Sequence, residues 1–275
     1  MRKISNVLRA ASCCTFSLLM CLPAAGQDAW SQADCVTLLD STAVTVQPNG
    51  SGSFAVYRSF RVQTPKGAVN NHVIKYDYDP LTAFARFKQV TLQRANGETV
   101  QVDVTKTCDY AAPARAIYWG ARQIMIELGS LEPGDTVSYE ISKKGFTYAL
   151  LAGREDDDAR FIPPMRGQFY DIVPFWVDQP TRRKVYTVSM PMEKELQFQF
   201  YNGACASSMR YEDGRKVYTF AKNEVLPFGR EPNMVDLFDE APKLMMSSTP
   251  RWEDKSLWFL SLIHISEPTR LLSIS

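Results

Sequence analysis

The fold of this chain is decided by residues 35–63, which read CVTLLDSTAVTVQPNGSGSFAVYRSFRVQ. Apolar and polar residues alternate through much of 35–47 and again through 53–63, and this period of two is typical of strands that bury one face. The residues between these runs, 48–52, read PNGSG and supply the proline, asparagine and glycine of a turn. We therefore expect two antiparallel strands joined by a hairpin turn.

The same pattern returns along the chain. Residues 85–94 and 99–105 flank the turn ANGE, residues 122–130 and 136–145 flank LEPGD, and a last pair surrounds Asp213–Gly214. Two more runs, 183–191 and 196–203, lie between these pairs. Short strands with a turn signal about every ten residues predict an all-β sandwich rather than alternating strands and helices.

The composition is that of an ordinary globular protein. The 275 residues are 45% hydrophobic and 22% charged, with a net charge of +1 at pH 7. This balance gives no reason to expect a nucleic acid as partner, because no basic block is interleaved with aromatic residues.

The amino terminus has the pattern of a secretory signal peptide over residues 1–26. Arg2, Lys3 and Arg9 precede a short apolar run that ends in small residues at Ala24 and Gly26. Acylation at Cys21 is the alternative, but Met20 is larger than the small residue such a site normally has before it. No later segment approaches the roughly 20 apolar residues of a membrane span. We expect a periplasmic or secreted protein without a membrane span.

Export leaves three cysteines in the mature chain, Cys35, Cys108 and Cys205. At most one internal disulfide can form among them, and all three pairings stay open. None of these cysteines stands in a CxxC spacing, so the sequence predicts neither a zinc nor a redox motif, and we expect no cofactor.

Two stretches break the strand pattern. Residues 153–167 are acidic and then proline-rich, which indicates a long loop. Residues 226–250 carry four prolines and little periodicity, which predicts an extended linker after a domain over 30–225. Pro250 suits the first position of a helix capped by Ser248 or Thr249, so residues 251–259 are expected to begin a second domain.

Residues 131–140, LEPGDTVSYE, and residues 94–102, RANGETVQV, resemble the turns and strands of the DUF3857 domain. The resemblance extends over roughly residues 36–246. It implies an Ig-like antiparallel β-sandwich that stands amino-terminal to a transglutaminase-like cysteine peptidase domain in exported bacterial proteins, often from Bacteroidota. Residues 247–259, SSTPRWEDKSLWF, are similar to the opening of that second domain.

The catalytic residues of such a second domain are missing from this chain. A transglutaminase-like site needs a thiol activated by a histidine, but no cysteine follows Cys205, and the two histidines are His72 and His264. The fragment is therefore expected to be no enzyme. Its expected partners are its own missing carboxy-terminal domain and a peptide or glycan substrate.

The last residues do not read as part of a domain. Residues 260–270, LSLIHISEPTR, resemble the conceptual translation of a transposase adapter used in preparing sequencing libraries. We therefore expect residues 260–275 to be an artefact and the gene to be cut at about Phe259.

Weaker signals leave binding roles open. Trp119, Phe175 and Trp176 are candidate ligand or interface residues, and with Tyr118, Phe169 and Tyr170 they suit a carbohydrate-binding module, the alternative function. That alternative predicts an exposed tryptophan coplanar with a neighbouring ring.

Two sets of carboxylates are weaker candidates. The acidic run 155–158 could ligate calcium, although such a run is more often a solvated surface loop. Asp77 and Asp79 lie on one face of a strand at a spacing that would suit the two catalytic carboxylates of a glycosidase, although neighbouring acids on a strand edge are more often solvated surface residues. No residue is expected to be catalytic.

Overall fold

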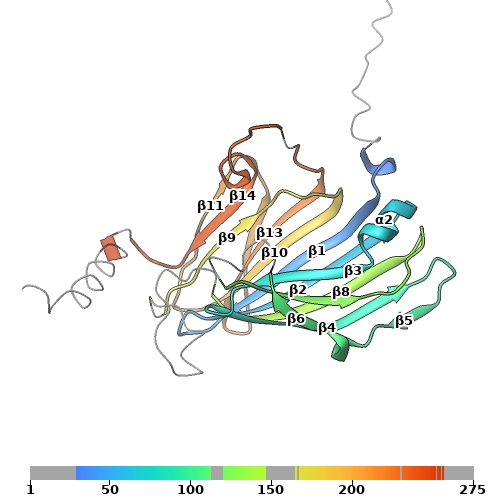
Figure 1. The fold of residues 1–275 in the computed structure, drawn as a ribbon. Helices are drawn as coiled ribbons and strands as arrows, with labels where there is room; N and C mark the ends of the chain where they lie inside the picture. Colours follow the sequence, from blue (N-terminus) through green and yellow to red (C-terminus); the bar gives the residue numbers. More distant parts are fainter. Residues whose placement is uncertain are drawn as a thin grey trace, which may run out of the picture.

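The computed structural model describes residues 29–112, 120–146, 165, 167–229, 231–251, 253, 254 and 256, and over them the fold is all-β (Figure 1). The first strands are β1 (Cys35–Val46), β2 (Gly52–Val62), β3 (Val73–Tyr78), β4 (Ala83–Gln93), β5 (Thr99–Gln101), β6 (Cys108–Ala111) and β7 (Arg122–Glu127). The others are β8 (Thr136–Gly145), β9 (Tyr170–Pro174), β10 (Thr181–Pro191), β11 (Gln197–Tyr201), β12 (Ala206–Glu212), β13 (Arg215–Val225) and β14 (Lys243–Ser247).

Helices are short in the described part of the chain and include α2 (Pro65–Asn70), α4 (Leu237–Glu240) and the 3-10 turn η1 (Val104–Lys106). Thr64 caps α2, because its hydroxyl oxygen accepts a hydrogen bond from the Gly67 backbone at 3.0 Å, and Pro65 fixes the first helical position. Asp236 caps α4 in the same way through the Phe238 backbone.

The strands form one large sheet and two small ones. The large sheet has eight strands in the order β12-β13-β10-β1-β2-β8-β4-β5, and the small sheets run β11-β14-β9 and β3-β7-β6. In Figure 1 both small sheets lie in front of the large one, side by side. The sandwich therefore has a continuous layer on one side and a divided layer on the other.

The all-β sandwich predicted from the sequence is confirmed, but two of its details are wrong. β1 and β10 are parallel neighbours at the centre of the large sheet, so the sandwich is not purely antiparallel. The divided second layer also differs from the two sheets of an Ig-like fold. Alternation in sequence tells which residues share a face, but it does not tell which strands become neighbours or in which direction they run.

Three of the predicted hairpins form. β1 pairs with β2, β4 with β5, and β12 with β13 around Asp213 and Gly214, both of which have positive φ. The predicted pairing of 122–130 with 136–145 is wrong, because β7 lies in a small sheet and β8 in the large one. The turn at 131–135 thus crosses between layers instead of closing a hairpin.

The linker predicted for residues 226–250 is also wrong. Its last part is β14, the central strand of the sheet β11-β14-β9, and Leu244 and Met246 of this strand are buried in the core. The sequence did not predict this strand, because it is only five residues long and lies between prolines. The sandwich extends at least to Ser247.

The core consists of two clusters that share one face of the large sheet. On β2, Phe54 belongs to the cluster under β11-β14-β9, whereas Phe60 and Val62 belong to the cluster under β3-β7-β6. Val56 packs against both clusters. These residues alternate along one strand, so they face the same side. Arg58 has the same phase and lies between the two clusters.

Several sequence-based expectations lie outside the described residues: the signal peptide at 1–26, the acidic run 155–158, Trp119 and the tail at 260–275. Of the segment 251–259, the structure describes only Arg251, Glu253, Asp254 and Ser256, the last three in helical conformation. Within the described part of the chain, no helix has the length and apolar character needed to cross a membrane.

Candidate functional site

A row of polar side chains crosses the large sheet between the two core clusters. Lys222 of β13 lies opposite Lys184 of β10, Lys184 opposite Asp40 of β1, Asp40 opposite Arg58 of β2, and Arg58 opposite Tyr139 of β8. Directly opposite residues in neighbouring strands point to the same face. The row therefore separates the two apolar clusters with groups that need hydrogen-bonding partners.

The centre of this row is an ion pair that is shielded from water. Lys184 Nζ lies 2.6 Å from Asp40 Oδ2, and the two side chains are 14% and 17% exposed. Arg58 donates to Tyr139, and its Nη2 lies 3.4 Å from Thr37 Oγ1. Burial disfavours the charged form of Arg58, but Tyr139 and Asp40 outweigh it and raise the pKa of Arg58. Both cations are thus stabilised by neighbours on the same sheet.

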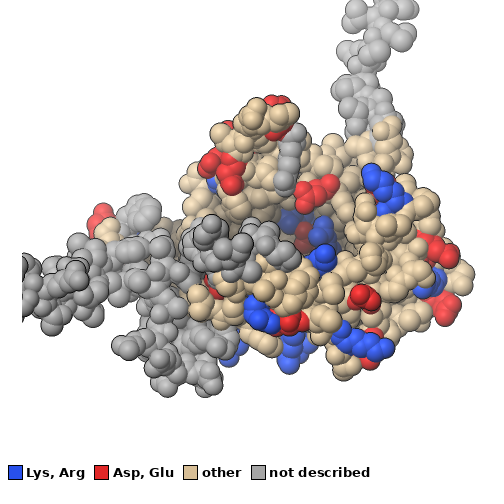
Figure 2. All heavy atoms as spheres, in the orientation of Figure 1, with Lys and Arg blue, Asp and Glu red and all other residues tan. Residues whose placement is uncertain are grey.

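Above the row, the two small sheets leave a hollow. In Figure 2 this hollow opens between β9 and β3, with atoms of Lys or Arg and of Asp or Glu recessed in it. Polar groups lie near it on the large sheet and on both small sheets. Asp171 of β9 is close enough to Tyr76 of β3 and to Lys143 of β8 to act electrostatically on both. We call Asp171, Tyr76 and Lys143, together with the row of polar side chains, the inter-sheet cleft.

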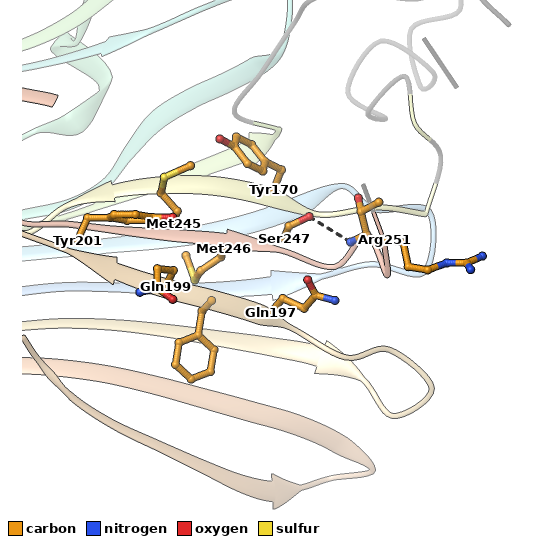
Figure 3. A pocket seen from close by; sticks show the side chains of 10 residues that line it. Tyr170, Gln197, Gln199, Tyr201, Met245, Met246, Ser247 and Arg251 are labelled. Carbon is orange, nitrogen blue, oxygen red and sulfur yellow. Dashed lines mark hydrogen bonds between the residues drawn. The ribbon is translucent and has the colours of Figure 1, made fainter. Parts of the chain in front are cut away.

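A second concavity lies on the outer face of β11-β14-β9 (Figure 3). Its volume is about 370 Å³. Its lining residues are Tyr170, Gln197, Phe198, Gln199, Tyr201, Met245, Met246, Ser247, Thr249 and Arg251. The Thr249 backbone N–H donates to Ser247 Oγ at 3.1 Å, so the chain leaving β14 turns along the edge of this outer hollow.

The aromatic residues singled out from the sequence do not form a stacking platform in the described residues. Phe175 is fully buried in the core, where it packs edge-on against Phe200, and it cannot contact a ligand there. Trp176 is half-buried and meets the Phe238 ring at an interplanar angle of 88°, so the two rings are not coplanar. Trp119 lies outside the described residues.

The two strand carboxylates are held in separate structural interactions. Asp77 is exposed and accepts a hydrogen bond from the Gln123 side chain of β7. Asp79 follows β3 and accepts from the Leu81 backbone at 2.8 Å, which closes a turn. Neither carboxylate faces the other across a cleft, so a hydrolase pair finds no support in these two residues. Among the described residues, no cluster of His, Cys, Asp or Glu is suited to a metal ion.

The cysteines that the structure describes are all unpaired: Cys35 is buried, Cys108 exposed and Cys205 half-buried. Burial raises the pKa of the Cys35 thiol to about 11, and burial also raises the pKa of Cys205. A nucleophilic cysteine needs the opposite shift. His72 is exposed, with its ring nitrogen against the Val69 carbonyl oxygen.

The LEPGD turn is structural. Asp135 is buried, and its carboxylate accepts from Arg94 Nη1 at 2.8 Å, from the Glu132 backbone at 2.9 Å and from the Ala95 backbone at 3.1 Å. Gly134 has a φ of 99°, which favours glycine. The turn therefore ties the hairpin between β4 and β5 to the start of β8.

Comparison with known proteins places the fold. The family model of DUF3857, a domain of unknown function with a solved structure, matches residues 48–228. The chain belongs to the DUF3857 family. The matched range leaves out β1 and β14 of this DUF3857 domain, although both strands lie inside its sheets. None of the curated proteins matches the chain.

Solved structures resemble the DUF3857 domain in fold. One is a protein from Parabacteroides distasonis described as a "putative protease", with a TM-score of 0.62 and 15% identity over 79% of this chain and 41% of that chain. An M1 zinc metallopeptidase from Deinococcus radiodurans matches more loosely, with a TM-score of 0.40 and 15% identity over 79% of this chain and 42% of that chain. The chain thus spans less than half the length of the solved proteins it matches.

Sequence reasoning missed the inter-sheet cleft, although a signal for it was present. Arg58 stands in the phase of Phe54, Val56, Phe60 and Val62, so it is a charge at a core-facing position of an otherwise regular strand. Lys143 interrupts β8 in the same way, after Val137, Tyr139 and Ile141. Charges at inward positions indicate either a buried ion pair or a site.

Proposed function

We propose that this chain is a non-catalytic β-domain of a longer exported protein, in which it scaffolds, or positions substrate for, a transglutaminase-like cysteine peptidase or transferase domain. The observation that carries the proposal is the match to the Parabacteroides protein, of whose chain this fold accounts for only 41%. That protein's description as a "putative protease" supports placing the β-domain beside a peptidase domain.

The chemistry of the described thiols supports the non-catalytic part of the proposal. A cysteine nucleophile needs a partly exposed thiol with a lowered pKa and a histidine beside it. Burial raises the pKa of both Cys35 and Cys205. His72, the histidine within the described residues, donates from Nδ1 to the Val69 carbonyl oxygen instead of contacting a thiol.

The outer hollow is the surface that suits contact with a second domain. Met245 of β14 lies opposite Gln199 of β11 and Ile172 of β9, so the outer face mixes apolar and amide side chains. Arg251 lines this hollow and also opens the segment 251–259. Whatever follows Arg251 in the chain therefore begins next to this face, which favours packing at short distance.

The first test is to read the gene in its source DNA across the codons for residues 255–275. The proposal expects an open frame that continues past Phe259 into a domain with a cysteine and a downstream histidine. A frame that ends with residues 260–275 as given would overturn the proposal, because no catalytic domain would then follow.

The second test places one new thiol on the full-length product. In a Cys108→Ser background, Gln199→Cys reports the outer hollow, and Lys88→Cys, on an exposed position of β4, is the matched control. We expect a maleimide to label Lys88→Cys at least tenfold faster than Gln199→Cys in the native protein, and at an equal rate after denaturation. Equal native rates would rule out this face as the contact with the second domain.

A further inference from the structure

The inter-sheet cleft contains a lysine, Lys143, whose ammonium group has no hydrogen bond or ion pair within the part of the chain that the structure describes. Lys143 of β8 lies opposite Phe54 of β2 and Ala85 of β4, and its Nζ lies 4.6 Å from the centre of the Phe54 ring. Among the described residues, nothing forms a hydrogen bond or an ion pair with this ammonium group. Burial lowers the pKa of Lys143, although Asp171 acts in the opposite direction. An aromatic face compensates only partly for a charge removed from water.

The neighbours of Lys143 are already engaged or neutral. Tyr186 Oη donates to Asp171 Oδ2, so this carboxylate is stabilised from within the cleft. Burial, together with the charge of Asp171, raises the pKa of Tyr76 to about 12, so Tyr76 remains a neutral phenol that can donate a hydrogen bond. Lys143 and Tyr76 therefore present donors from the large sheet and from the sheet β3-β7-β6.

Among the described residues of the cleft, the cations outnumber the carboxylates by one. The cations are Arg58, Lys143, Lys184 and Lys222, and the carboxylates that act on them are Asp40, Asp171 and, from an exposed position, Asp178. Lys184 is neutralised by Asp40, and Arg58 is stabilised by Asp40, Tyr139 and Asp178. Neither Lys143 nor Lys222 has a direct ion pair within the described residues, and Lys143 lies over the Phe54 ring. An excess of one charge matches a single carboxylate, whereas a phosphate dianion would bring a second charge close to Asp171.

We propose that the inter-sheet cleft binds a carboxylate of a peptide, with the Lys143 ammonium group as its ion-pair partner and the Tyr76 hydroxyl as a hydrogen-bond donor. The apolar side of the site is the Phe54 ring beneath the ammonium group. Charge-assisted hydrogen bonds of this kind are the strong ones in a partly desolvated site. This inference goes beyond the proposed function and does not depend on it, because the cleft is distinct from the outer hollow.

The experiment is a calorimetric titration of the full chain, at low salt and pH 7, with short capped peptides. N-acetyl-trialanine carries one carboxylate at its C terminus, its C-terminal amide carries none, and an amidated N-acetyl-Ala-Glu-Ala carries one on a side chain. We expect saturable binding of at least one of the charged peptides and at least tenfold weaker binding of the uncharged amide. The stronger of the two charged peptides identifies which carboxylate the cleft takes. Equal binding of all three peptides, or none, would overturn the proposal.

Matched variants locate the site. Lys143→Met should weaken binding of the charged peptide at least tenfold, whereas Lys144→Met, the exposed neighbour on the other face of β8, should leave it unchanged. Lys143→Met should also unfold at an equal or higher denaturant concentration than the unmodified chain, because it removes a desolvated charge. Tyr76→Phe is the second variant and should weaken binding severalfold. If Lys144→Met lost as much binding as Lys143→Met, the cleft would not be the site.

Discussion

Lys184 donates a hydrogen bond to Asp40 across the parallel strands β1 and β10, with 2.6 Å between Nζ and Oδ2. The two residues are 144 positions apart in sequence. The pair lies in the polar row between the two core clusters, on neighbouring strands near the middle of the large sheet. The contact therefore ties β1 to β10 and satisfies two charges that are shielded from water.

Breaking this pair should destabilise the fold strongly. Asp40→Ala leaves the ammonium group of Lys184 shielded and unpaired, and we expect a loss of about 3 kcal/mol in the free energy of unfolding, measured by urea denaturation. The control is Arg182→Met, which removes an exposed pair with Glu224 and should cost less than about 1 kcal/mol. Equal costs for the two variants would contradict this prediction.

Replacing both partners should cost less than removing one. In the double variant Asp40→Leu with Lys184→Met, no buried charge is left unpaired, so the loss should be smaller than that of Asp40→Ala. A double variant less stable than the single one would show that the pair contributes more than its desolvation cost.

Residues of β14 should behave as core residues and not as a linker. Leu244 is fully buried, and Leu244→Ala should lower the free energy of unfolding by about 2–5 kcal/mol. Leu226→Ala is the control, because Leu226 is 42% exposed and its truncation should change stability by less than about 1 kcal/mol. Similar values for both variants would mean that β14 is not part of the cooperative unit.

Gly145 should tolerate no side chain. Its φ is 143°, and a Cβ there would lie 2.1 Å from the Thr82 carbonyl oxygen. Gly145→Ala should therefore cost at least about 3 kcal/mol, since overpacking adds to backbone strain. Gly120→Ala, at a φ of 61° with open space around it, should cost only about 1 kcal/mol. Urea denaturation of the two variants measures both losses. If Gly145→Ala cost no more than Gly120→Ala, the end of β8 would not lie as close to the Thr82 carbonyl oxygen as described.

The thiols should differ in reactivity and in their effect on stability. Burial raises the pKa of Cys35 from 9.0 to about 11, so at pH 8 iodoacetamide should modify exposed Cys108 at least a hundredfold faster than Cys35 in the native state.

The raised pKa of Cys35 should also make stability depend on pH, because the folded state keeps the proton that the unfolded thiol loses. The contribution of Cys35 to stability is therefore complete below about pH 9 and is lost as the pH rises towards 11. A Cys35→Ala variant should lack this part of the alkaline decline, and an identical decline would contradict the assignment.

Much of the fold could be predicted from local signals. The alternation in 35–47 and 53–63, with the PNGSG turn between them, predicted the hairpin of β1 and β2 because period and turn chemistry act over a few residues. Asp213–Gly214 predicted its hairpin for the same reason. The turn sequence LEPGD was recognised, but its role was not, because the partners of Asp135 are Arg94 and Ala95, about 40 residues away.

The sequence by itself determined that the chain is built of strands that bury one face, where most of the tight turns lie, and to which family the domain belongs. Only the tertiary structure decided that β1 and β10 are parallel neighbours, that β7 and β8 separate into different sheets, and that β14 completes a sheet. It also decided that Lys143, Tyr76 and Asp171 face one cleft. The physical reason is that side-chain period is fixed within a strand, whereas the choice of neighbour depends on which distant surfaces bury each other.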